Sequence, residues 1–261
     1  MKLIINADDL GFNDAINEAI VLLAQKHHIN ACSHMVFGHL SDEHRSILTK
    51  TRETHTPKGF QYIGLHLDMT SHLVPEQHLS LPLRQLILTT FFRSLSRYSI
   101  ENSIKAQLDR FEDTWNHAPD FIDGHQHVHQ FAQIRHILLN ECLKRYSKEK
   151  LPFIRSTRPF AHTKNAKAHI IYLLGGRQMR KLALKKGFQT NQAFGGVYHF
   201  KHCDETTLTT LWQNWITAAK TEPAIIMCHP AMNAHSSEDE ISNARLLEFQ
   251  FLNQHNIQDL L

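Results

Sequence analysis

Aspartate and histidine side chains gather in one short stretch of the chain, FIDGHQHVHQ, at residues 121–130. His125, His127 and His129 stand there at every second position behind Asp123. Imidazole and carboxylate groups are ligands that divalent metals such as Zn²⁺ take in proteins. The chain has 21 histidines among 261 residues, so a single histidine is weak evidence for a site. The stretch is evidence for a metal site only if other segments bring further carboxylates or imidazoles to it.

Three other segments carry such side chains, each within or directly after a short apolar run. Asp8 and Asp9 follow KLIINA, His66 lies within IGLHL, and His229 follows AIIMC. One carboxylate with two imidazoles forms an open metal site that leaves room for water and a substrate. The metal would lower the pKa of its bound water and polarise a carbonyl oxygen, while a further carboxylate and histidine would act as base and acid. A metal, a base and an acid together can catalyse the hydrolysis of an amide or an ester.

Each residue is also compatible with a purely structural role. Asp8 and Asp9 ahead of Gly11 fit a turn, His66 fits a hydrogen-bonded core histidine, and His229 fits a strand end. The histidines after Asp123 share one face only if the strand continues through all of them, because side chains alternate along a strand. If the strand stops at its first histidine, the other two are loop residues with separate roles.

The elements that must position these residues alternate between strands and helices. Strands are predicted for the apolar runs at 2–7, 31–37, 61–69, 120–127, 152–157 and 224–230. Helices are predicted over 13–27, with Asn13 or Asp14 as N-cap, and over 101–116, 131–146, 206–220 and 238–255. Residues 71–100 and 161–200 fit the alternation poorly and are predicted to be long loops or insertions.

This alternation predicts an α/β fold with a parallel sheet covered on both faces. At 261 residues the chain fits a single domain over 1–261, a closed or nearly closed barrel of the deformed (β/α) type. The polar clusters all fall at the carboxyl ends of predicted strands, where the loops of such folds form active sites. Four segments converging on one rim favour a metal site over four separate structural roles.

The composition excludes several other classes of protein. Lys+Arg 28 against Asp+Glu 25 gives a net charge of +3, which argues against a nucleic-acid or anionic-membrane partner. The four cysteines form no C-x-x-C pair, so neither a zinc knuckle nor a dithiol motif is present. No apolar stretch approaches the ~18 residues that a membrane span needs, and the start does not resemble a signal peptide. We therefore expect a reduced, cytoplasmic protein without a membrane span.

Two details of the site stay open at this level. Asp8 and Asp9 are neighbours on a strand and point to opposite faces unless the chain turns there, which the nearby Gly11 would permit. Arg155 and Arg158 in IRSTRP would either hold substrate hydroxyls or form ion pairs at a strand end.

The segments INADDLGF, GLHLDMT, DGHQHVH, GGVYHF and MCHPA, in this order, resemble the YdjC-like carbohydrate deacetylases from residue 3 to about residue 232. That family includes chitooligosaccharide deacetylase and hopanoid-biosynthesis deacetylases. The resemblance implies a deformed (β/α) barrel, often a homodimer, that removes an acetyl group from a small N-acetylated carbohydrate. It also implies one divalent metal cation as cofactor, Mg²⁺ or Zn²⁺.

The resemblance assigns roles to individual residues. The metal ligands would be Asp9, His66 and His125. Asp8 would be the catalytic base, and His229 would protonate the leaving amine. His127 and His129 would lie beside the metal or contact the substrate. The chain departs from the family pattern at Leu10, Phe37 and Gly124, which bears on the sugar more than on the chemistry.

Two functions other than deacetylation would also use aspartate and histidine side chains. A barrel phosphoesterase or another amidohydrolase would use a similar set of ligands, but such sites typically hold two metals and open with H-x-H on the first strand. This chain opens instead with Asp8 and Asp9. A non-catalytic, histidine-rich metal-binding protein would need neither a second carboxylate beside the ligand nor His229 on another strand.

Overall fold

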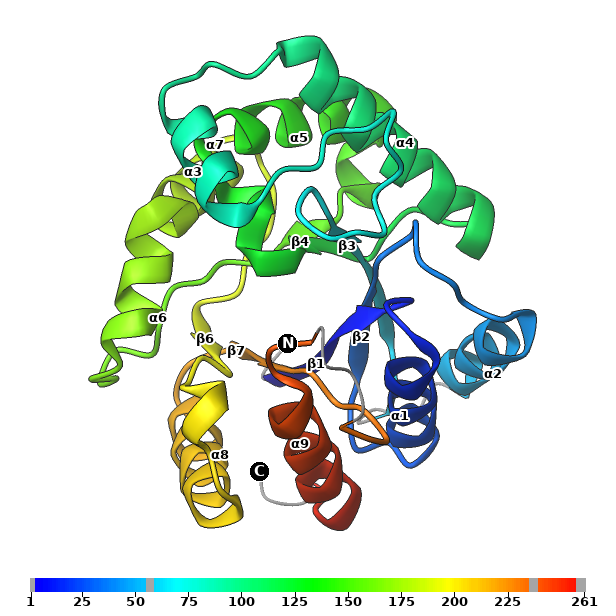
Figure 1. Cartoon of the computed structure of the whole chain (residues 1–261), viewed down its shortest axis with the longest axis vertical. Helices are drawn as coiled ribbons and strands as arrows, with labels where there is room; N and C mark the ends of the chain where they lie inside the picture. The colour runs from blue at the N-terminus through cyan, green and yellow to red at the C-terminus, as the bar shows by residue number, and fades with distance from the viewer. Residues whose placement is uncertain (1–2, 55–58, 235–238, 257–261) are drawn as a thin grey trace.

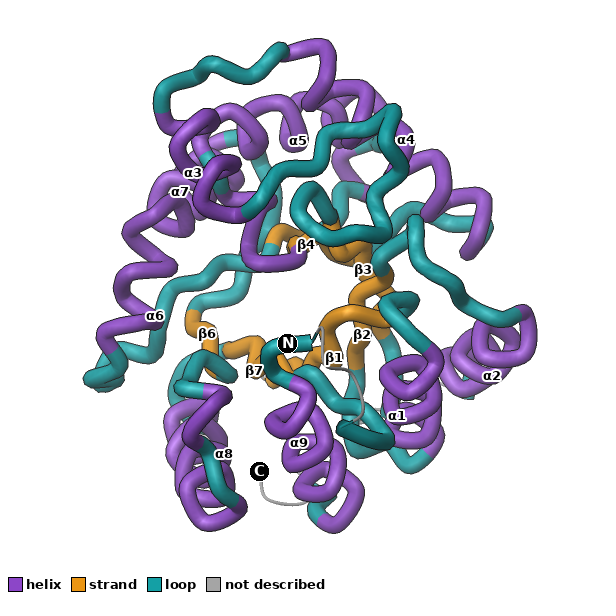
Figure 2. Tube along the Cα trace, in the orientation of Figure 1, coloured by secondary structure: helices purple, strands orange, loops and turns teal. Residues whose placement is uncertain are grey.

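The computed structural model describes residues 3–54, 59–234 and 239–256. Across these residues, seven parallel strands form one sheet in the order β5-β4-β3-β2-β1-β7-β6. The strands are β1 (Leu3–Leu10), β2 (Ala31–His34), β3 (Tyr62–Leu67), β4 (Phe121–Gly124), β5 (Phe153–Ile154), β6 (Ala193–Gly195) and β7 (Ala224–Cys228). The sheet curls around a centre with the helices outside it (Figures 1 and 2). This confirms the predicted α/β barrel.

The two edge strands approach each other through isolated contacts instead of a continuous ladder. The Ile154 backbone N–H donates to the Gln189 carbonyl at 2.9 Å. Single parallel bridges link Ile154 to Thr190 and Pro159 to Phe194. The barrel is therefore deformed at this seam, because β5 and β6 are too short to pair along their length.

The helices cover the outside of the sheet and bury one side each. They are α1 (Asp14–Gln25), α2 (Asp42–Glu53), α3 (Leu83–Phe91), α4 (Arg97–Trp115), α5 (Ala132–Arg145), α6 (Ala166–Ile171), α7 (Arg177–Lys185), α8 (Glu205–Ala219) and α9 (Ser242–Gln254). Asn13 caps α1 by accepting the Ile16 N–H at 3.0 Å, as one of the two predicted caps. The core-facing residues of α1, among them Ile16 and Ile20, are fully buried.

Residues 71–100 and 161–200 were predicted to be long loops or insertions, and the first alternative was wrong for much of both segments. The first holds α3 and the start of α4, and the second holds α6, α7 and β6. On α3, Leu88 and Phe91 are 57% and 72% exposed, so its apolar residues do not mark a single buried face. At three residues, β6 is too short to show a strand period. None of the helices in the described ranges combines the length and hydrophobicity needed to cross a membrane.

Candidate metal centre and neighbouring acid–base groups

The backbone turns at Asp9, so that two adjacent carboxylates reach the same cluster. The pairing of β1 with β2 is irregular between Ala7 and Leu10. Asp9 has a φ of 69°, in the left-handed region that few residues other than glycine adopt but that aspartate tolerates. The open question of strand parity is thereby answered: the turn lies at Asp9 itself, ahead of Gly11. Both Asp8 and Asp9 are buried.

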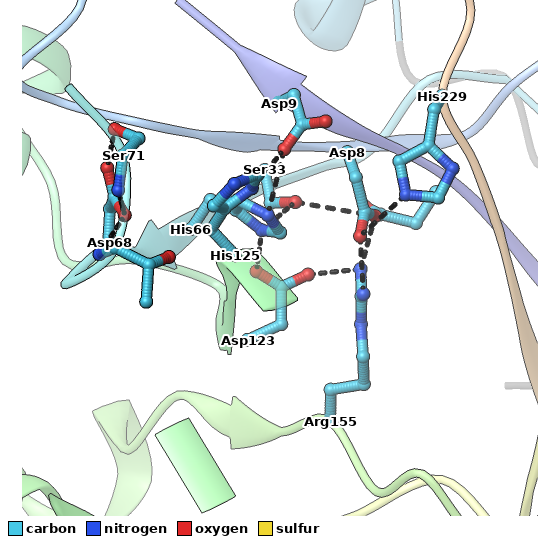
Figure 3. A network of polar contacts seen from close by, with 12 residues as sticks. Asp8, Asp9, Ser33, His66, Asp68, Ser71, Asp123, His125, Arg155 and His229 are labelled. Atoms are coloured by element: carbon cyan, nitrogen blue, oxygen red, sulfur yellow. Dashed lines mark hydrogen bonds and ion pairs between the residues drawn. The ribbon is translucent and has the colours of Figure 1, made fainter. Parts of the chain in front are cut away.

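Three ligand atoms from three strand ends meet at Asp9 (Figure 3). Asp9 Oδ1 lies 3.2 Å from His66 Nε2 and 3.0 Å from His125 Nδ1. Metal–ligand bonds of ~2.0–2.2 Å at tetrahedral or octahedral angles place neighbouring ligand atoms ~3–3.5 Å apart. The donor set of one carboxylate and two imidazoles, with these separations, fits a divalent metal.

His66 is oriented through its other ring nitrogen. Its Nδ1 lies 2.7 Å from Asp123 Oδ1 and 3.1 Å from Ser33 Oγ. An Nδ1–H donated to Asp123 leaves the Nε2 lone pair facing Asp9, an arrangement typical of metal-bound histidines. Burial lowers the pKa of His66, but Asp123 and then Asp9 raise it to about 10. Without a metal, His66 therefore carries a proton on Nε2 as well, and a bound metal would take the place of that proton.

Asp8 is bound to an arginine instead of to an imidazole. Arg155 donates from Nη1 to Asp8 Oδ2 at 2.7 Å and from Nη2 to Asp8 Oδ1 at 2.6 Å. The same guanidinium contacts Asp123, and Arg155 is fully buried. Burial raises the pKa of Asp8, but the charge and hydrogen bonds of Arg155 hold it well below its usual range. Asp8, His66 and Asp123 also lie close enough for a metal, yet Arg155 occupies both carboxylates of that group.

Arg155 and Arg158 of IRSTRP were expected either to hold substrate hydroxyls or to form ion pairs. Both form ion pairs in the structure. Arg155 follows β5 and joins Asp8 to Asp123 inside the barrel. Arg158 donates to the Gln192 carbonyl at 2.7 Å and lies 3.5 Å from Glu222. Within the described ranges, no recorded contact joins Arg158 to the cluster around Asp9.

The strand stops before the second and third histidines of HQHVH. β4 ends at Gly124, and His125–Gln130 forms a 3₁₀ segment in which His127 has a φ of 61°. The ring of His127 packs edge-on against Phe194, with centroids 5.9 Å apart. His129 is fully buried, with Nε2 3.1 Å from the Arg155 carbonyl. Neither belongs to the group of ligand atoms around Asp9, so of the three only His125 joins it.

Gly124 lets this segment fold tightly against the end of β3. A Cβ at that position would lie 3.0 Å from the Leu67 carbonyl and 3.1 Å from the His129 backbone nitrogen. Both separations are tighter than ordinary van der Waals contact. Gly124, where the chain departs from the family pattern, therefore leaves the space that the close packing of His129 requires.

His229 lies at the end of β7, apart from the three ligand atoms. Its Nε2 is 3.9 Å from Asp8 Oδ2, and its ring packs edge-on against Phe200. The Glu248 carboxylate accepts the His229 backbone N–H, and its Oε2 lies 3.9 Å from the ring Nδ1. Burial lowers the pKa of His229 to about 4. The predicted residues Asp8, Asp9, His66, His125 and His229 thus converge on one region, as Figure 3 shows.

A family model for YdjC-like proteins matches residues 2–261, which is nearly the whole chain. The chain belongs to the YdjC-like family. The carbohydrate deacetylase of Danio rerio is 29% identical over 149 residues, 52% of this chain and 45% of the relative. The chitooligosaccharide deacetylase of Klebsiella pneumoniae is 29% identical over 133 residues, 51% of this chain and 52% of the relative. The matched parts thus span about half the length of each curated relative.

A solved structure shares the fold of this YdjC-like chain. It is a protein of Enterococcus faecalis named for cellobiose-phosphate cleavage, with a TM-score of 0.64 and 17% identity. The match covers 98% of this chain and 92% of that protein. At this identity the likeness supports the barrel and says nothing of the substrate.

The YdjC-like chain also carries two site residues that the sequence analysis missed, both on α9. Arg245 donates to Asp9 Oδ2 at 2.8 Å and to Asp239 Oδ2 at 2.6 Å. Glu248, one turn further on, contacts His229 and accepts the Tyr198 hydroxyl at 2.7 Å. An Arg-x-x-Glu pair on a helix usually marks a solvent-exposed face, and only the apolar residues around it, ARLLEFQF, signal burial.

Proposed function

We propose that this chain is a metal-dependent carbohydrate deacetylase, which hydrolyses the acetamide of an N-acetylated sugar to a free amine and acetate. The observation that carries the proposal is the convergence of Asp9 Oδ1 with His66 Nε2 and His125 Nδ1 at 3.2 and 3.0 Å. A second carboxylate, Asp8, and a further histidine, His229, lie beside that group. The names of the two curated relatives support an N-acetylated sugar as the substrate.

The residues that would hold the metal are Asp9, His66 and His125. A bound Zn²⁺ or Mg²⁺ would supply Lewis acidity, lowering the pKa of a water molecule and polarising the acetamide oxygen. The buried acids Asp8, Asp9 and Asp123 outnumber the buried arginines Arg155 and Arg245, so the chain itself leaves negative charge for a cation to balance.

Asp8 is the base in this proposal. Arg155 keeps it ionised at any physiological pH, as a base must be, and fixes both of its oxygens in place. The same ion pair makes Asp8 a weak base, so it suits a water molecule that is already acidic. Arg155 is then a residue that orients Asp8, and its complete burial argues against a contact with sugar hydroxyls.

His229 is the acid that protonates the amine as it leaves. It stands on the other side of Asp8 from the ligand atoms, with Nε2 3.9 Å from Asp8 Oδ2. Base and acid each supply ~10²–10⁴ in rate in enzymes of known mechanism. His127, packed against Phe194 at the edge of this group, is proposed to contact the sugar, whereas His129 is held by the Arg155 carbonyl.

Acetate release from N-acetylglucosamine and its oligomers, with and without a chelator, tests the proposal. We expect release that the chelator abolishes and that added Zn²⁺ or Mg²⁺ restores. A phosphoesterase would instead release phosphate from aryl phosphates and leave the acetamides intact. A storage protein would bind several metals weakly per chain and turn over neither substrate, so metal content per chain separates that rival. Absence of acetate release from the metal-loaded chain on every N-acetylated sugar would contradict the proposal.

A further inference from the structure

We infer that Glu248 is a positioning residue that passes a proton to His229 while His229 protonates the leaving amine. The inference rests on the proposed deacetylase function, because it concerns the acid of that reaction. It concerns a residue on α9, outside the strand ends that carry the metal ligands and the base.

Tyr198, Glu248 and His229 form a row of contacts that ends at the ring of His229. The Tyr198 hydroxyl donates to Glu248 Oε1 at 2.7 Å, and Glu248 Oε2 accepts the His229 backbone N–H. The same Oε2 lies 3.9 Å from His229 Nδ1, which is buried and has no hydrogen-bond partner in the described part of the chain. A small rotation of the ring would close this gap, as catalytic hydrogen bonds often tighten only with substrate bound.

Glu248 is buried without the partner that a buried carboxylate normally has. It is 1% exposed, and among the described residues His229 alone is close enough to form an ion pair with it. Arg245, on the same helix, donates from Nε to Asp239 and from Nη2 to Asp9, and not to Glu248. If Glu248 were only an acceptor for one N–H and one O–H, a glutamine would serve without the cost of burying an ionisable group. The carboxyl group therefore points to a use of its proton.

Burial keeps a proton on Glu248 up to about pH 7. The ionisable groups that face Glu248 lie on β1, β7 and α9 and in the segments after β6 and β7: Asp8, Tyr198, Cys203, Cys228, His229 and Arg245. Burial raises the pKa of Glu248 to about 7, against the hydrogen bonds from the His229 backbone and Tyr198. Burial lowers the pKa of His229 to about 4. The resting pair therefore consists of a neutral imidazole and a carboxyl that is protonated up to about pH 7.

A neutral imidazole can give up its Nε2 proton only if Nδ1 gains one, because an imidazolate is a far stronger base than an amine. As the C–N bond breaks, its electron pair stays on nitrogen, which takes the proton from His229 Nε2. At the same time the O–H bond of Glu248 breaks and an N–H bond forms at His229 Nδ1. The step leaves a neutral His229 in its other tautomer and an ionised Glu248. The pair is reset when His229 Nε2 takes a proton from solvent and Nδ1 returns its proton to Glu248.

Glu248→Gln in the metal-loaded chain is the direct test, because the amide keeps the size and the acceptor oxygen but has no proton to pass on. We expect kcat for acetate release to fall ~10²-fold, the usual worth of a positioned acid, with KM within ~2-fold of the wild type. The wild-type decline in rate as the pH rises through about 7 should disappear. The matched control is Glu141→Gln, another buried glutamate, on α5, which should keep the wild-type kcat and pH profile. A Glu248→Gln enzyme with wild-type kcat and the same decline near pH 7 would overturn the inference.

Tyr198→Phe keeps the test decisive if Glu248→Gln does not fold. The Tyr198 hydroxyl stabilises the ionised form of Glu248, so its removal should raise the pKa of Glu248 and move the alkaline decline to higher pH. A purely structural role for the Tyr198–Glu248 contact predicts lower stability with the decline at an unchanged pH. That result would equally overturn the inference.

Histidine NMR separates this inference from the proposed function. In Zn²⁺-saturated protein carrying ¹³C-labelled histidine, the His229 resonance is assigned by its loss in His229→Asn. We expect it to respond to an ionisation near pH 7 in the wild type and not in Glu248→Gln. That response without acetate release would support the proton pair and reject the deacetylase, whereas acetate release without the response would reject the pair alone.

Discussion

The proposed metal side of the site and its proposed acid side are built in different ways. On the metal side, Asp9, His66 and His125 stand at or just after the ends of β1, β3 and β4, all strands of one parallel sheet. On the acid side, His229 follows the end of β7, and it contacts Glu248 of α9 and Phe200 of the segment after β6. The sheet ladder fixes the first set, and the docking of a helix against the barrel fixes the second. The two sides should therefore respond differently to substitution.

The largest expected effect is on the metal side. His125→Ala removes one of three ligand atoms and should leave the chain with little bound metal and acetate release below detection. His129→Ala, four residues on, should keep its metal because its ring contacts the Arg155 carbonyl and not Asp9. Metal content by elemental analysis, beside acetate release, decides the matter. Finding His129→Ala metal-free and His125→Ala fully loaded would reverse the assignment.

Asp8→Asn tests the boundary between the two sides. The amide has the volume of the carboxylate and can still accept from Arg155, so metal content should be normal. Acetate release should fall ~10²–10⁴-fold, because an amide cannot take up the proton of a water molecule. Asp9→Asn should instead weaken metal binding, with activity partly recovered at high metal concentration. If the two variants exchanged these behaviours, Asp8 would be the ligand and Asp9 the base.

His229→Ala probes the acid side alone. The variant should fold and keep its metal while kcat falls by ~10² or more, since no ligand atom is lost. Adding Glu248→Gln to it should cause little further loss, because residues that act through one another are not additive. Near-normal turnover of His229→Ala would remove His229 from the reaction.

Arg158→Ala should have the smallest effect. Its partners, Glu222 and the Gln192 carbonyl, lie outside both sides of the site, and the arginine is 38% exposed. We expect kcat and KM within ~2-fold of the wild type and a loss of stability of at most ~1 kcal/mol, as for exposed ion pairs. A rise in KM of tenfold or more would restore Arg158 as a substrate contact.

The sequence was enough to bring Asp9, His66 and His125 to one rim because strand ends are predictable positions. Their roles as metal ligands came from the family resemblance and stay a prediction. An apolar run followed by a carboxylate or an imidazole locates the group at the loop rim of a parallel barrel, as for Asp8 and His229. The local backbone conformation was harder to predict. Asp9 and His127 are left-handed, which breaks the alternation of a strand, and their residue types do not indicate it. Two elements also lacked a periodic pattern in the sequence. Strand β6 is too short to show one, and several apolar residues of α3 are exposed and so do not mark a buried face.

The acid side could be predicted only in part. The helix over 238–255 was expected, and α9 lies within that range at Ser242–Gln254. Which of its residues face the site depends on how the helix docks, and Arg245 with Glu248 has the spacing of an ordinary surface ion pair. Glu248 and Tyr198 meet only in three dimensions, 50 positions apart. Asp123 was noticed but was given no part in orienting His66.

The contact between Asp9 and Arg245 spans 236 positions, so it bears on the order in which the site is made during translation. All three proposed ligands have been synthesised once residue 125 is in place, whereas the guanidinium that pairs with Asp9, that of Arg245, comes 120 residues later. Segments that leave the ribosome early begin to fold before late ones exist, and distant contacts form slowly. The nascent barrel would thus carry Asp9 without its arginine until α9 docks. Docking of that helix would be the event that pairs Asp9 with Arg245 and completes the proposed site.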